Sequence, residues 1–357
     1  MARLRRSDCS GPGITRRRRG RGFAYYDEDG EKVDEPEVLE RINELRIPPA
    51  WKGVWICPYP MGHLQATGLD ARGRKQYLYH SKWRERRDQQ KFDDMIAFAH
   101  ALPKMRERMD ADLARTGMDR ERVLAAAVRL LERGFFRVGG EDYAVENETY
   151  GLATMKKSHV TLDRDGSIRF DYPSKSGQRQ VRSIVAPEVF DIVKQLKQRR
   201  GGSDELLAYR DGRTWVDVRS SDINAYLKEA TGGDFSAKDF RTWNATVLAA
   251  VALAVSPSAS ASKTSRKRAI ARAVKEVALY LGNTPAVCRA SYIDPRVFDR
   301  FQAGYTISGV IAELGEQNDL ERSALHGNVE EAVLDLLAED VDAEGVESVD
   351  EVMEVVA

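Results

Sequence analysis

The sequence predicts an α+β protein of two domains: a small, mostly β N-terminal domain and a larger, mainly α domain with one small antiparallel sheet. Three observations lead to this prediction. Strand-and-turn patterns dominate residues 23–95, helical spacing of apolar residues begins near residue 81, and a β pattern interrupts that spacing at 159–185. At 357 residues the chain is long enough for two ordinary domains.

The N-terminal domain is expected to span residues 23–95. Residues 22–26 are predicted to form a strand that runs into a tight turn, and a short helix at 36–45 is expected to end before a Pro-Pro breaker. Further strands are expected near 54–57 and 76–79. Residues 1–22 hold eight arginines and one aspartate, and we expect them to form a basic, disordered arm.

The second domain is expected to span residues 96–325. Apolar residues at three- and four-residue spacing predict its helices, which are 81–102, 120–133, 187–199, 220–231, 243–254 and 263–281. Strands separated by turn residues predict its antiparallel sheet, which comprises 159–162, 168–172 and 180–185. The serine-rich residues 256–262 are expected to be a mobile linker.

Charge is segregated along a chain whose formal net charge is zero. Residues 330–357 contain eleven acidic residues and no Lys or Arg, so the rest of the chain carries 56 basic and 45 acidic residues. A basic body suits a polyanionic partner. We expect residues 326–357 to form an acidic tail that either competes with that partner or is simply solvated, and the basic arm is open to the same two interpretations.

Several classes of protein are disfavoured by what the sequence lacks. No apolar run approaches the ~20 residues that cross a bilayer, and the first residues lead into arginines, so we expect a cytoplasmic protein without a membrane partner. Cys9, Cys57 and Cys288 form no C-x-x-C pair, which argues against a disulfide framework or a zinc ribbon. Without a phosphate-binding G-x-x-x-x-G-K-[ST] loop or an ordered carboxylate cluster, phosphoryl chemistry is expected to need no nucleotide, metal or other cofactor.

Five segments carry a resemblance to a known family. They are GRKQY at 73–77, FFRVG at 135–139, ENETYGL at 146–152, KDFRT at 238–242, and LGNTP at 281–285 followed by Ser291-Tyr292. In this order they resemble the poxvirus-type type IB DNA topoisomerases and their bacterial relatives, over roughly residues 23–310. The resemblance implies a monomer, associated with the nucleoid, whose two domains form a clamp around double-stranded DNA and which relaxes supercoils by cutting and rejoining one strand.

The resemblance also assigns catalytic residues. Tyr292 attacks the phosphate and forms a 3′-phosphotyrosine, while Arg137 and Arg241 grip the nonbridging oxygens. A guanidinium suits that role because it contacts two phosphate oxygens and stays charged. Lys175 falls where the family has its general acid for the 5′-oxygen, and a tight hairpin turn is independently a good place to deliver one long side chain.

Asn283 departs from the commonest family pattern, which has histidine nine residues before the nucleophile. An amide donates a hydrogen bond to a phosphate oxygen but carries no charge and shuttles no proton, so we expect a hydrogen-bonding role in the active site. The alternative is a helix cap before Thr284-Pro285.

Several residues are expected to contact DNA, although those at 74–79 are alternatively a strand with an exposed polar face. The expected contacts are Arg74, Gln76, Tyr77, Tyr79, Tyr143 and Lys238. Poxvirus members have lysine where this chain has Gly140, so their sequence preference is not expected here.

Two alternative functions remain open. A tyrosine recombinase shares the catalytic fold and nucleophile, but usually has histidine two or three residues before the second arginine, where this chain has KDF at 238–240. The other alternative is a catalytically silent DNA-binding relative. The presence together of Arg137, Lys175, Arg241 and Tyr292 argues against it.

Overall fold

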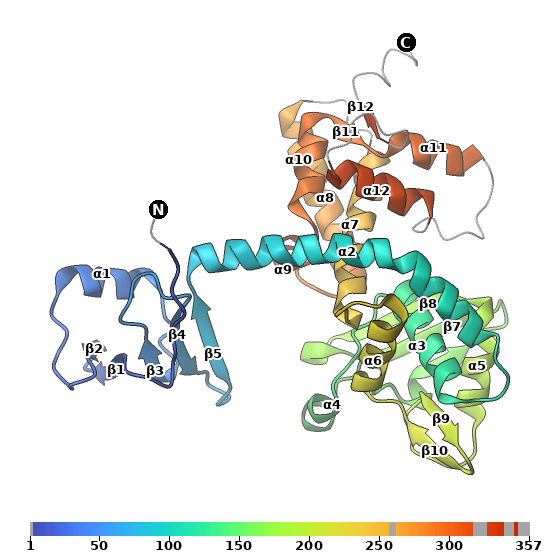
Figure 1. Cartoon of the computed structure of the whole chain (residues 1–357), viewed down its shortest axis with the longest axis horizontal. Helices are drawn as coiled ribbons and strands as arrows, with labels where there is room; N and C mark the ends of the chain where they lie inside the picture. The colour runs from blue at the N-terminus through green and yellow to red at the C-terminus, as the bar shows by residue number, and fades with distance from the viewer. Residues whose placement is uncertain (1–2, 257–261, 317–326, 339–345, 349–357) are drawn as a thin grey trace. The chain divides into compact units, whose positions relative to one another are not determined.

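The computed structural model describes residues 3–256, 262–316, 327–338 and 346–348. Residues 257–261 of the expected linker and much of the expected acidic tail lie outside the described residues. The chain divides into two compact units, Met1–Phe92 and Asp93–Ala357 (Figure 1). The first is built on an antiparallel sheet and the second is mainly helical, which confirms the predicted α+β class. None of the described helices is long and apolar enough to span a membrane.

The first unit contains a five-stranded antiparallel sheet in the order β2-β1-β3-β4-β5. Its elements are β1 (Ile14–Arg19), β2 (Gly22–Tyr26), α1 (Pro36–Glu44), β3 (Lys52–Ile56), β4 (Leu64–Leu69) and β5 (Lys75–Tyr79). The expectation of a disordered arm was therefore wrong for residues 14–19. They form a strand because Ile14 is buried in the core and the backbone pairs with both β2 and β3, which arginine content alone does not reveal.

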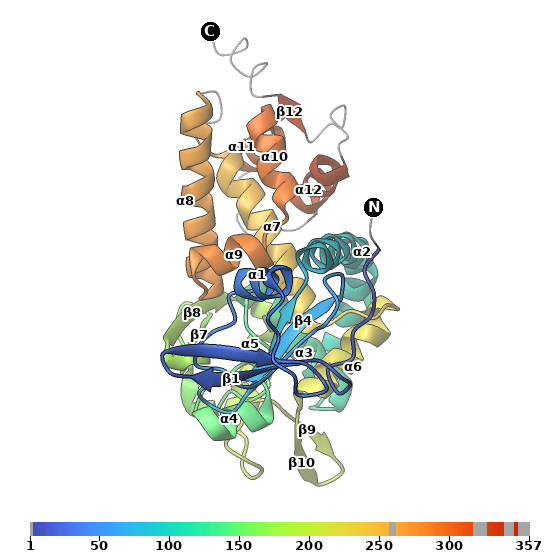
Figure 2. The same ribbon diagram turned by 90° about the vertical axis from the view of Figure 1, so that its left-hand side faces the viewer.

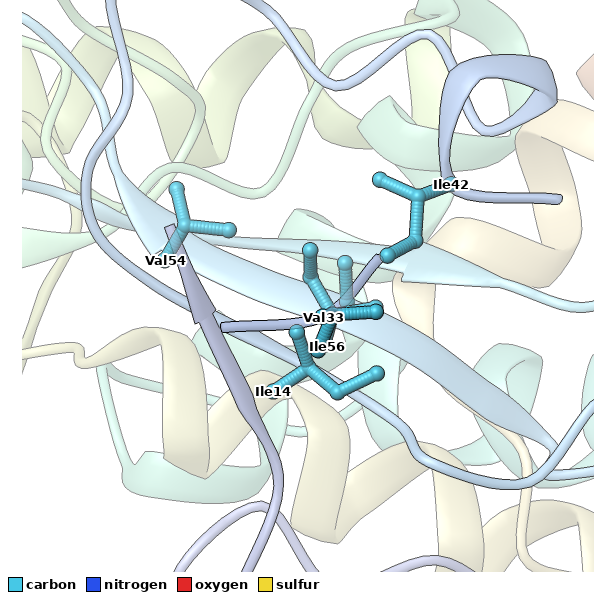
Figure 3. Packing of buried hydrophobic residues seen from close by; sticks show 6 residues of the cluster. Ile14, Val33, Ile42, Val54 and Ile56 are labelled. Atoms are coloured by element: carbon cyan, nitrogen blue, oxygen red, sulfur yellow. The ribbon is translucent and has the colours of Figure 1, made fainter. Parts of the chain in front are cut away.

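Register assigns the two faces of this sheet, because residues directly opposite one another in a ladder point to the same side. Ile14 pairs with Ile56, Ile56 with Ala66, and Ala66 with Leu78. This row packs with Ile42 of α1 in the hydrophobic core, part of which Figure 3 shows. The apolar face of the sheet is therefore the one covered by α1.

The opposite face is defined by a second row across all five strands. In the order of the sheet, its members are Tyr26, Thr15, Trp55, Thr67 and Tyr77. Because side chains alternate along a strand, the exposed Arg17 and Arg19 of β1 share this second face, and Arg16 lies on the core side. Arg16 is structural, since its guanidinium donates hydrogen bonds to backbone carbonyls of residues 47, 48 and 51.

The second unit contains most of the helices. In chain order they are α2 (Ser81–Leu113, which begins in the first unit), α3 (Arg120–Gly134), α4 (Glu141–Asn147), α5 (Pro187–Gln198), α6 (Ser220–Thr231), α7 (Ala237–Ala254), α8 (Lys263–Leu281), α9 (Pro285–Ser291), α10 (Pro295–Ala303), α11 (Ser308–Glu316) and α12 (Asn328–Ala338). Helix α3 is buried along nearly all its length and packs on α5, α6 and α7. Helices α7 and α8 lie side by side (Figure 2).

Three small sheets accompany these helices among the described residues. Strands β6 (Val160–Leu162), β7 (Ser167–Pro173) and β8 (Arg179–Val185) form the antiparallel sheet that the sequence predicts. A hairpin of β9 (Ala208–Asp211) and β10 (Thr214–Asp217) was not predicted, nor was the pairing of β11 (Tyr305–Thr306) with β12 (Glu347–Ser348).

Helix α12 corrects the expectation of an acidic tail from residue 326. Val329, Val333, Leu336 and Leu337 are buried, and α12 packs on α7, α10 and α11 (Figure 1). Glu330 is also buried, where it accepts hydrogen bonds from Arg106 and from the indole of Trp243. The prediction used only the charge composition of this region. It overlooked the apolar residues, which recur at the three- and four-residue spacing of a packed helical face.

Candidate active site

Arg137 lies on a short segment that is pinned on both sides. Helix α3 ends at Gly134, and the next residue, Phe135, has a φ of 54° that turns the chain out of the helix. Phe136 is buried, with its ring centroid 4.8 Å from that of Phe170 in β7. The carbonyl of Arg137 accepts a hydrogen bond from the backbone of Leu152 (2.9 Å). These contacts fix the backbone that carries the half-buried Arg137 side chain.

The FFRVG and ENETYGL segments meet at two glycines. A Cβ atom on Gly151 would lie 2.4 Å from Cα of Gly139, and Gly139 itself has a φ of 91°. Only glycine fits both conditions. The two motifs, which lie apart in the sequence, are therefore one structural element around Arg137.

Arg241 lies one turn into α7 and is 4% exposed. Helix α7 begins at Ala237, earlier than the predicted 243, because the Asp239 carboxylate accepts a hydrogen bond from the Ser236 backbone N–H (2.8 Å) and caps the helix. The Arg241 guanidinium donates to the carbonyls of Phe135 and, at 2.9 Å, Leu281. Arg241 thus joins α7 to the segment before Arg137 and to the end of α8.

Tyr292 ends α9 and is half-buried. Its backbone carbonyl accepts a hydrogen bond from Thr246 of α7 (3.4 Å), and the Thr246 hydroxyl accepts one from the buried Asp294 backbone (3.1 Å). The Tyr292 ring centroid lies 5.2 Å from Cζ of Arg241. A tyrosine and a buried guanidinium are therefore in direct contact.

Asn283 lies between α8 and α9. Its Oδ1 accepts a hydrogen bond from Nη2 of Arg137 at 2.6 Å. Its Nδ2 is buried and has no hydrogen-bond partner among the described residues. The helix-cap alternative was wrong, because the hydroxyl of Thr284 caps α9 by accepting from the Val287 N–H. An unpaired buried amide donor beside Arg137 is suited to binding an anion.

Lys175 is exposed on the turn that joins β7 to β8. It lines one pocket, of about 320 Å³, together with Arg137, Lys238, Arg241 and Tyr292. The structure therefore brings these five residues, which are spread over more than 150 positions of the sequence, to one cavity. Asn283 does not line this pocket, but it is connected to the pocket residues by its hydrogen bond with Arg137.

The electrostatics of the pocket are set by burial and by like charge. Burial, and then the charge of Arg137, lower the pKa of Arg241 from its usual range, while a hydrogen bond and the charge of Tyr292 oppose the shift. Arginine begins from so high a pKa that Arg241 stays cationic at neutral pH. In the described part of the chain, no group of three or more His, Cys, Asp or Glu side chains is arranged to hold a metal ion.

The other predicted DNA contacts fall on both units. Tyr77 and Tyr79 are exposed and stacked, with ring centroids 6.2 Å apart, on the sheet face opposite α1. Arg74 and Gln76 both donate to the Asp70 carboxylate. Lys238 is exposed at the pocket. Tyr143 belongs to α4, and its side chain lies outside the described residues.

Arg182 of β8 was missed by the sequence analysis. Its guanidinium donates to the carbonyl of Tyr280 at the end of α8, and it is near enough to influence the pKa of Arg241. One sequence signal pointed to it: along a strand, residue 182 shares a face with Ile184, which is buried.

Comparison with known proteins identifies the family. Residues 80–313 match the family model of the catalytic core of eukaryotic DNA topoisomerase I, and residues 22–70 match that of the N-terminal domain of bacterial DNA topoisomerase IB. This chain belongs to the type IB DNA topoisomerase family. The five sequence motifs of the resemblance lie within or between these matched ranges, and the topoisomerase resemblance is confirmed.

Individual type IB topoisomerases support the same assignment. The chain is 33% identical over 297 residues to DNA topoisomerase 1B of Acanthamoeba polyphaga mimivirus, a match that covers 81% of this chain and 88% of the viral protein. It is 22% identical to DNA topoisomerase I of Monkeypox virus, over 74% of this chain and 82% of that protein. DNA topoisomerase 1 of Daucus carota is 32% identical over 36% of this chain, but only 15% of the plant protein is covered. The chain is therefore a DNA topoisomerase of type IB, and not a tyrosine recombinase.

Proposed function

We propose that this enzyme relaxes supercoiled duplex DNA by cutting and resealing one strand through a covalent bond to Tyr292. The observation that carries the proposal is the convergence of Arg137, Arg241 and Lys175 with Tyr292 on one pocket. These side chains supply what phosphodiester transfer without a metal requires, namely a nucleophile, cationic hydrogen-bond donors and a proton donor.

In the proposed cleavage step, the Tyr292 hydroxyl loses its proton to solvent water and its oxygen bonds to phosphorus, while the bond from phosphorus to the 5′-oxygen breaks. The products are a 3′-phosphotyrosine and a free 5′-hydroxyl. Arg137 and Arg241 hold the nonbridging oxygens, on which negative charge accumulates in the transition state. The amide N–H of Asn283 donates to the same phosphate, a role supported by its buried, unpaired Nδ2.

Lys175 is the proposed general acid, which gives its proton to the departing 5′-oxygen. Its exposed place on the hairpin turn, at the rim of the pocket, supports this role. Resealing runs the same steps in reverse, and between the two steps the free 5′ end rotates. The phosphotyrosine conserves the energy of the broken bond, so the proposed cycle needs no nucleotide, and the sequence has no nucleotide-binding motif. The guanidiniums of Arg137 and Arg241 take the place of a metal in stabilising the charge on the phosphate.

We further propose that both units contact double-stranded DNA as a clamp, the first through the β5 region and the second through Lys238 and Tyr143. The exposed tyrosine pair of β5 supports the first contact, because aromatic and cationic side chains on an open sheet face suit a phosphate-lined duplex. By the same family resemblance, the enzyme acts as a monomer on the nucleoid in the cytoplasm.

The deciding experiment is relaxation of supercoiled plasmid with a chelator and without ATP. We expect the wild-type chain to produce relaxed topoisomers and a covalent protein–DNA adduct. Tyr292→Phe removes only the hydroxyl, so it should bind duplex DNA normally and give neither product. Adducts formed by Tyr292→Phe would contradict the assignment of the nucleophile, and duplex binding by the wild-type chain without nicking would instead favour a catalytically silent relative.

A further inference from the structure

The carbonyl groups at the C-terminal end of α8 accept hydrogen bonds from residues outside the helix. The last carbonyls of any helix have no partner within the helix and need one from outside. At the end of α8, the N–H groups of Gly282 and Asn283 fold back onto the carbonyls of Leu279 (3.2 Å) and Ala278 (3.0 Å). Gly282 permits this turn because its φ is 63°.

The next three carbonyls each accept a hydrogen bond from an arginine. The pairs are Arg182 with Tyr280, Arg241 with Leu281 at 2.9 Å, and Arg137 with Gly282 at 3.1 Å. The three arginines come from different elements, namely β8, α7 and the segment after α3. The carboxyl end of one helix therefore gathers three guanidiniums that the sequence separates.

This arrangement has an electrostatic reason. Three neighbouring guanidiniums repel one another because they carry like charges. The pKa of Arg182 is lowered chiefly by burial; Tyr172 opposes this shift, and the charge of Arg137 adds a smaller lowering. The carboxyl end of a helix carries partial negative charge and stabilises cations within its last turn. The carbonyls of residues 280–282 thus hold the arginines close together while the phosphate is absent.

Arg182 differs from the other two arginines in its contacts. Besides the Tyr280 carbonyl, it donates to Gln180 (3.3 Å), and the buried Tyr172 is near enough to influence its pKa. Its Cζ lies 5.9 Å from the ring centroid of Phe136, the residue before Arg137. It does not line the pocket that Arg137, Arg241 and Tyr292 share. Arg182 therefore contacts the end of α8 and Phe136, which hold the other two arginines in place, and it does not contact the pocket itself.

We propose that Arg182 is a positioning residue for strand cleavage, which fixes the carboxyl end of α8 so that Arg137 and Arg241 meet the phosphate in one set geometry. The proposal rests on the proposed function, because Arg182 would orient the residues of that same active site. Arg182 acts through the other arginines and not by touching the phosphate. Its loss should consequently slow cleavage without weakening the binding of duplex DNA.

The test is single-turnover cleavage of a duplex, with equilibrium binding and thermal unfolding measured on the same variants. Displacement of catalytic groups by about 1 Å lowers rates by up to roughly 100-fold, so we expect Arg182→Met to cleave roughly 10- to 100-fold more slowly while its Kd changes less than about twofold. Arg182→Lys retains a cation for the Tyr280 carbonyl and should cleave faster than Arg182→Met. Arg169→Met is the matched control, because Arg169 is an exposed arginine on the other face of the same sheet, and it should cleave normally.

A double-mutant cycle separates positioning from a general loss of stability. If Arg182 acts through Arg137 and Arg241, then Arg182→Met should slow Arg137→Ala by a smaller factor than it slows the wild-type chain, because the effects of coupled residues are not additive. Wild-type cleavage in Arg182→Met, additive losses in the cycle, or no gain from Arg182→Lys would each overturn the proposal. Those outcomes leave the topoisomerase activity of the wild-type chain intact, whereas absence of cleavage by the wild-type chain would reject the proposed function as well.

Discussion

The guanidinium groups of the proposed active site are oriented mainly by backbone carbonyls. Arg241 donates to the carbonyls of Phe135 and Leu281, and Arg137 donates to that of Gly282 and to the side chain of Asn283. The positions of backbone carbonyls are fixed by the fold and do not depend on side-chain rotamers. The arginines are consequently ordered before a phosphate arrives, which is the condition under which charged donors lower a barrier most.

The first prediction concerns these two arginines. Loss of one preorganised donor typically costs ~3 to 4 kcal/mol of transition-state stabilisation, so Arg137→Ala and Arg241→Ala should each slow single-turnover cleavage by roughly 100- to 1,000-fold. Arg241→Ala should also lower the Tm, because two buried carbonyls lose their partner, while the half-buried Arg137 should affect the Tm less. Near-normal cleavage by either variant would remove that arginine from the catalytic set.

The second prediction concerns Lys175. If it protonates the 5′-oxygen, a substrate with sulfur at that bridging position should restore cleavage to Lys175→Ala, because a thiolate leaves without a proton. The same substrate should not restore Arg137→Ala, whose lost contact is to the nonbridging oxygens. Cleavage rates of both variants on both substrates decide the matter, and equal rescue of the two variants would mean that the acid lies elsewhere.

At the scale of elements, alternation along β1 places successive arginines of residues 16–19 on opposite faces of the sheet. Arg16 faces the core side and holds three carbonyls, whereas Arg17 and Arg19 lie on the face that carries Tyr77. Arg17 is also stacked on Tyr26, with its Cζ 4.5 Å from the ring centroid. Neighbouring arginines of one strand are therefore expected to differ in function.

The third prediction tests that difference by salt dependence. Each phosphate neutralised contributes ~0.9 to the slope of log affinity against log salt, so replacing both Arg17 and Arg19 by Gln should lower the slope by about 1.8 if each meets one phosphate. Arg18→Gln is the matched control, since Arg18 is an exposed arginine on the opposite face of β1, and its slope should not change. Equal effects of the two changes would show that total charge matters and the face does not.

At the scale of the whole chain, part of the acidic C-terminal region is packed into the second unit. Residues 328–338 form α12, which is packed into the second unit, and Glu330 of this helix is bonded to Arg106 and Trp243. Trp243 belongs to α7, two residues after Arg241. Helix α12 thus supports the element that carries a proposed catalytic residue, and is not a dispensable tail.

The fourth prediction compares two deletions. Removal of residues 349–357 takes away three acidic residues and should leave both the Tm and the chemical step unchanged, with tighter DNA binding at low salt if that segment competes with DNA. Removal of residues 327–357 exposes the apolar surface that α12 covers and should lower the Tm markedly. As a milder control, Leu337→Ala should cost ~2 to 5 kcal/mol of unfolding free energy, because Leu337 is fully buried. Equal Tm values for the two deletions would contradict this division.

Local patterns in the sequence determined much of the fold. Apolar spacing predicted α3, α5, α6 and α8 to within about two residues, and the turns at 165–166 and 174–177 located the β6–β8 sheet and the hairpin position of Lys175. These predictions succeeded because periodicity and turn residues are properties of consecutive residues. The motifs likewise named Arg137, Arg241 and Tyr292, and the family resemblance together with the hairpin turn named Lys175; the structure brings all four to one pocket.

Only the tertiary structure decided which charged residues are structural. Charge composition alone made residues 16–19 appear to be an arm and Glu330 part of a tail, because a charge count contains no information about burial. For Arg182, alternation along β8 indicated only a shared face with Ile184, and its partner, the carbonyl of Tyr280 nearly a hundred positions away, is known only from the structure. Partners so distant in sequence are chosen by packing, and the end of α8 selects its three arginines only once α7, β8 and the segment after α3 are assembled around it.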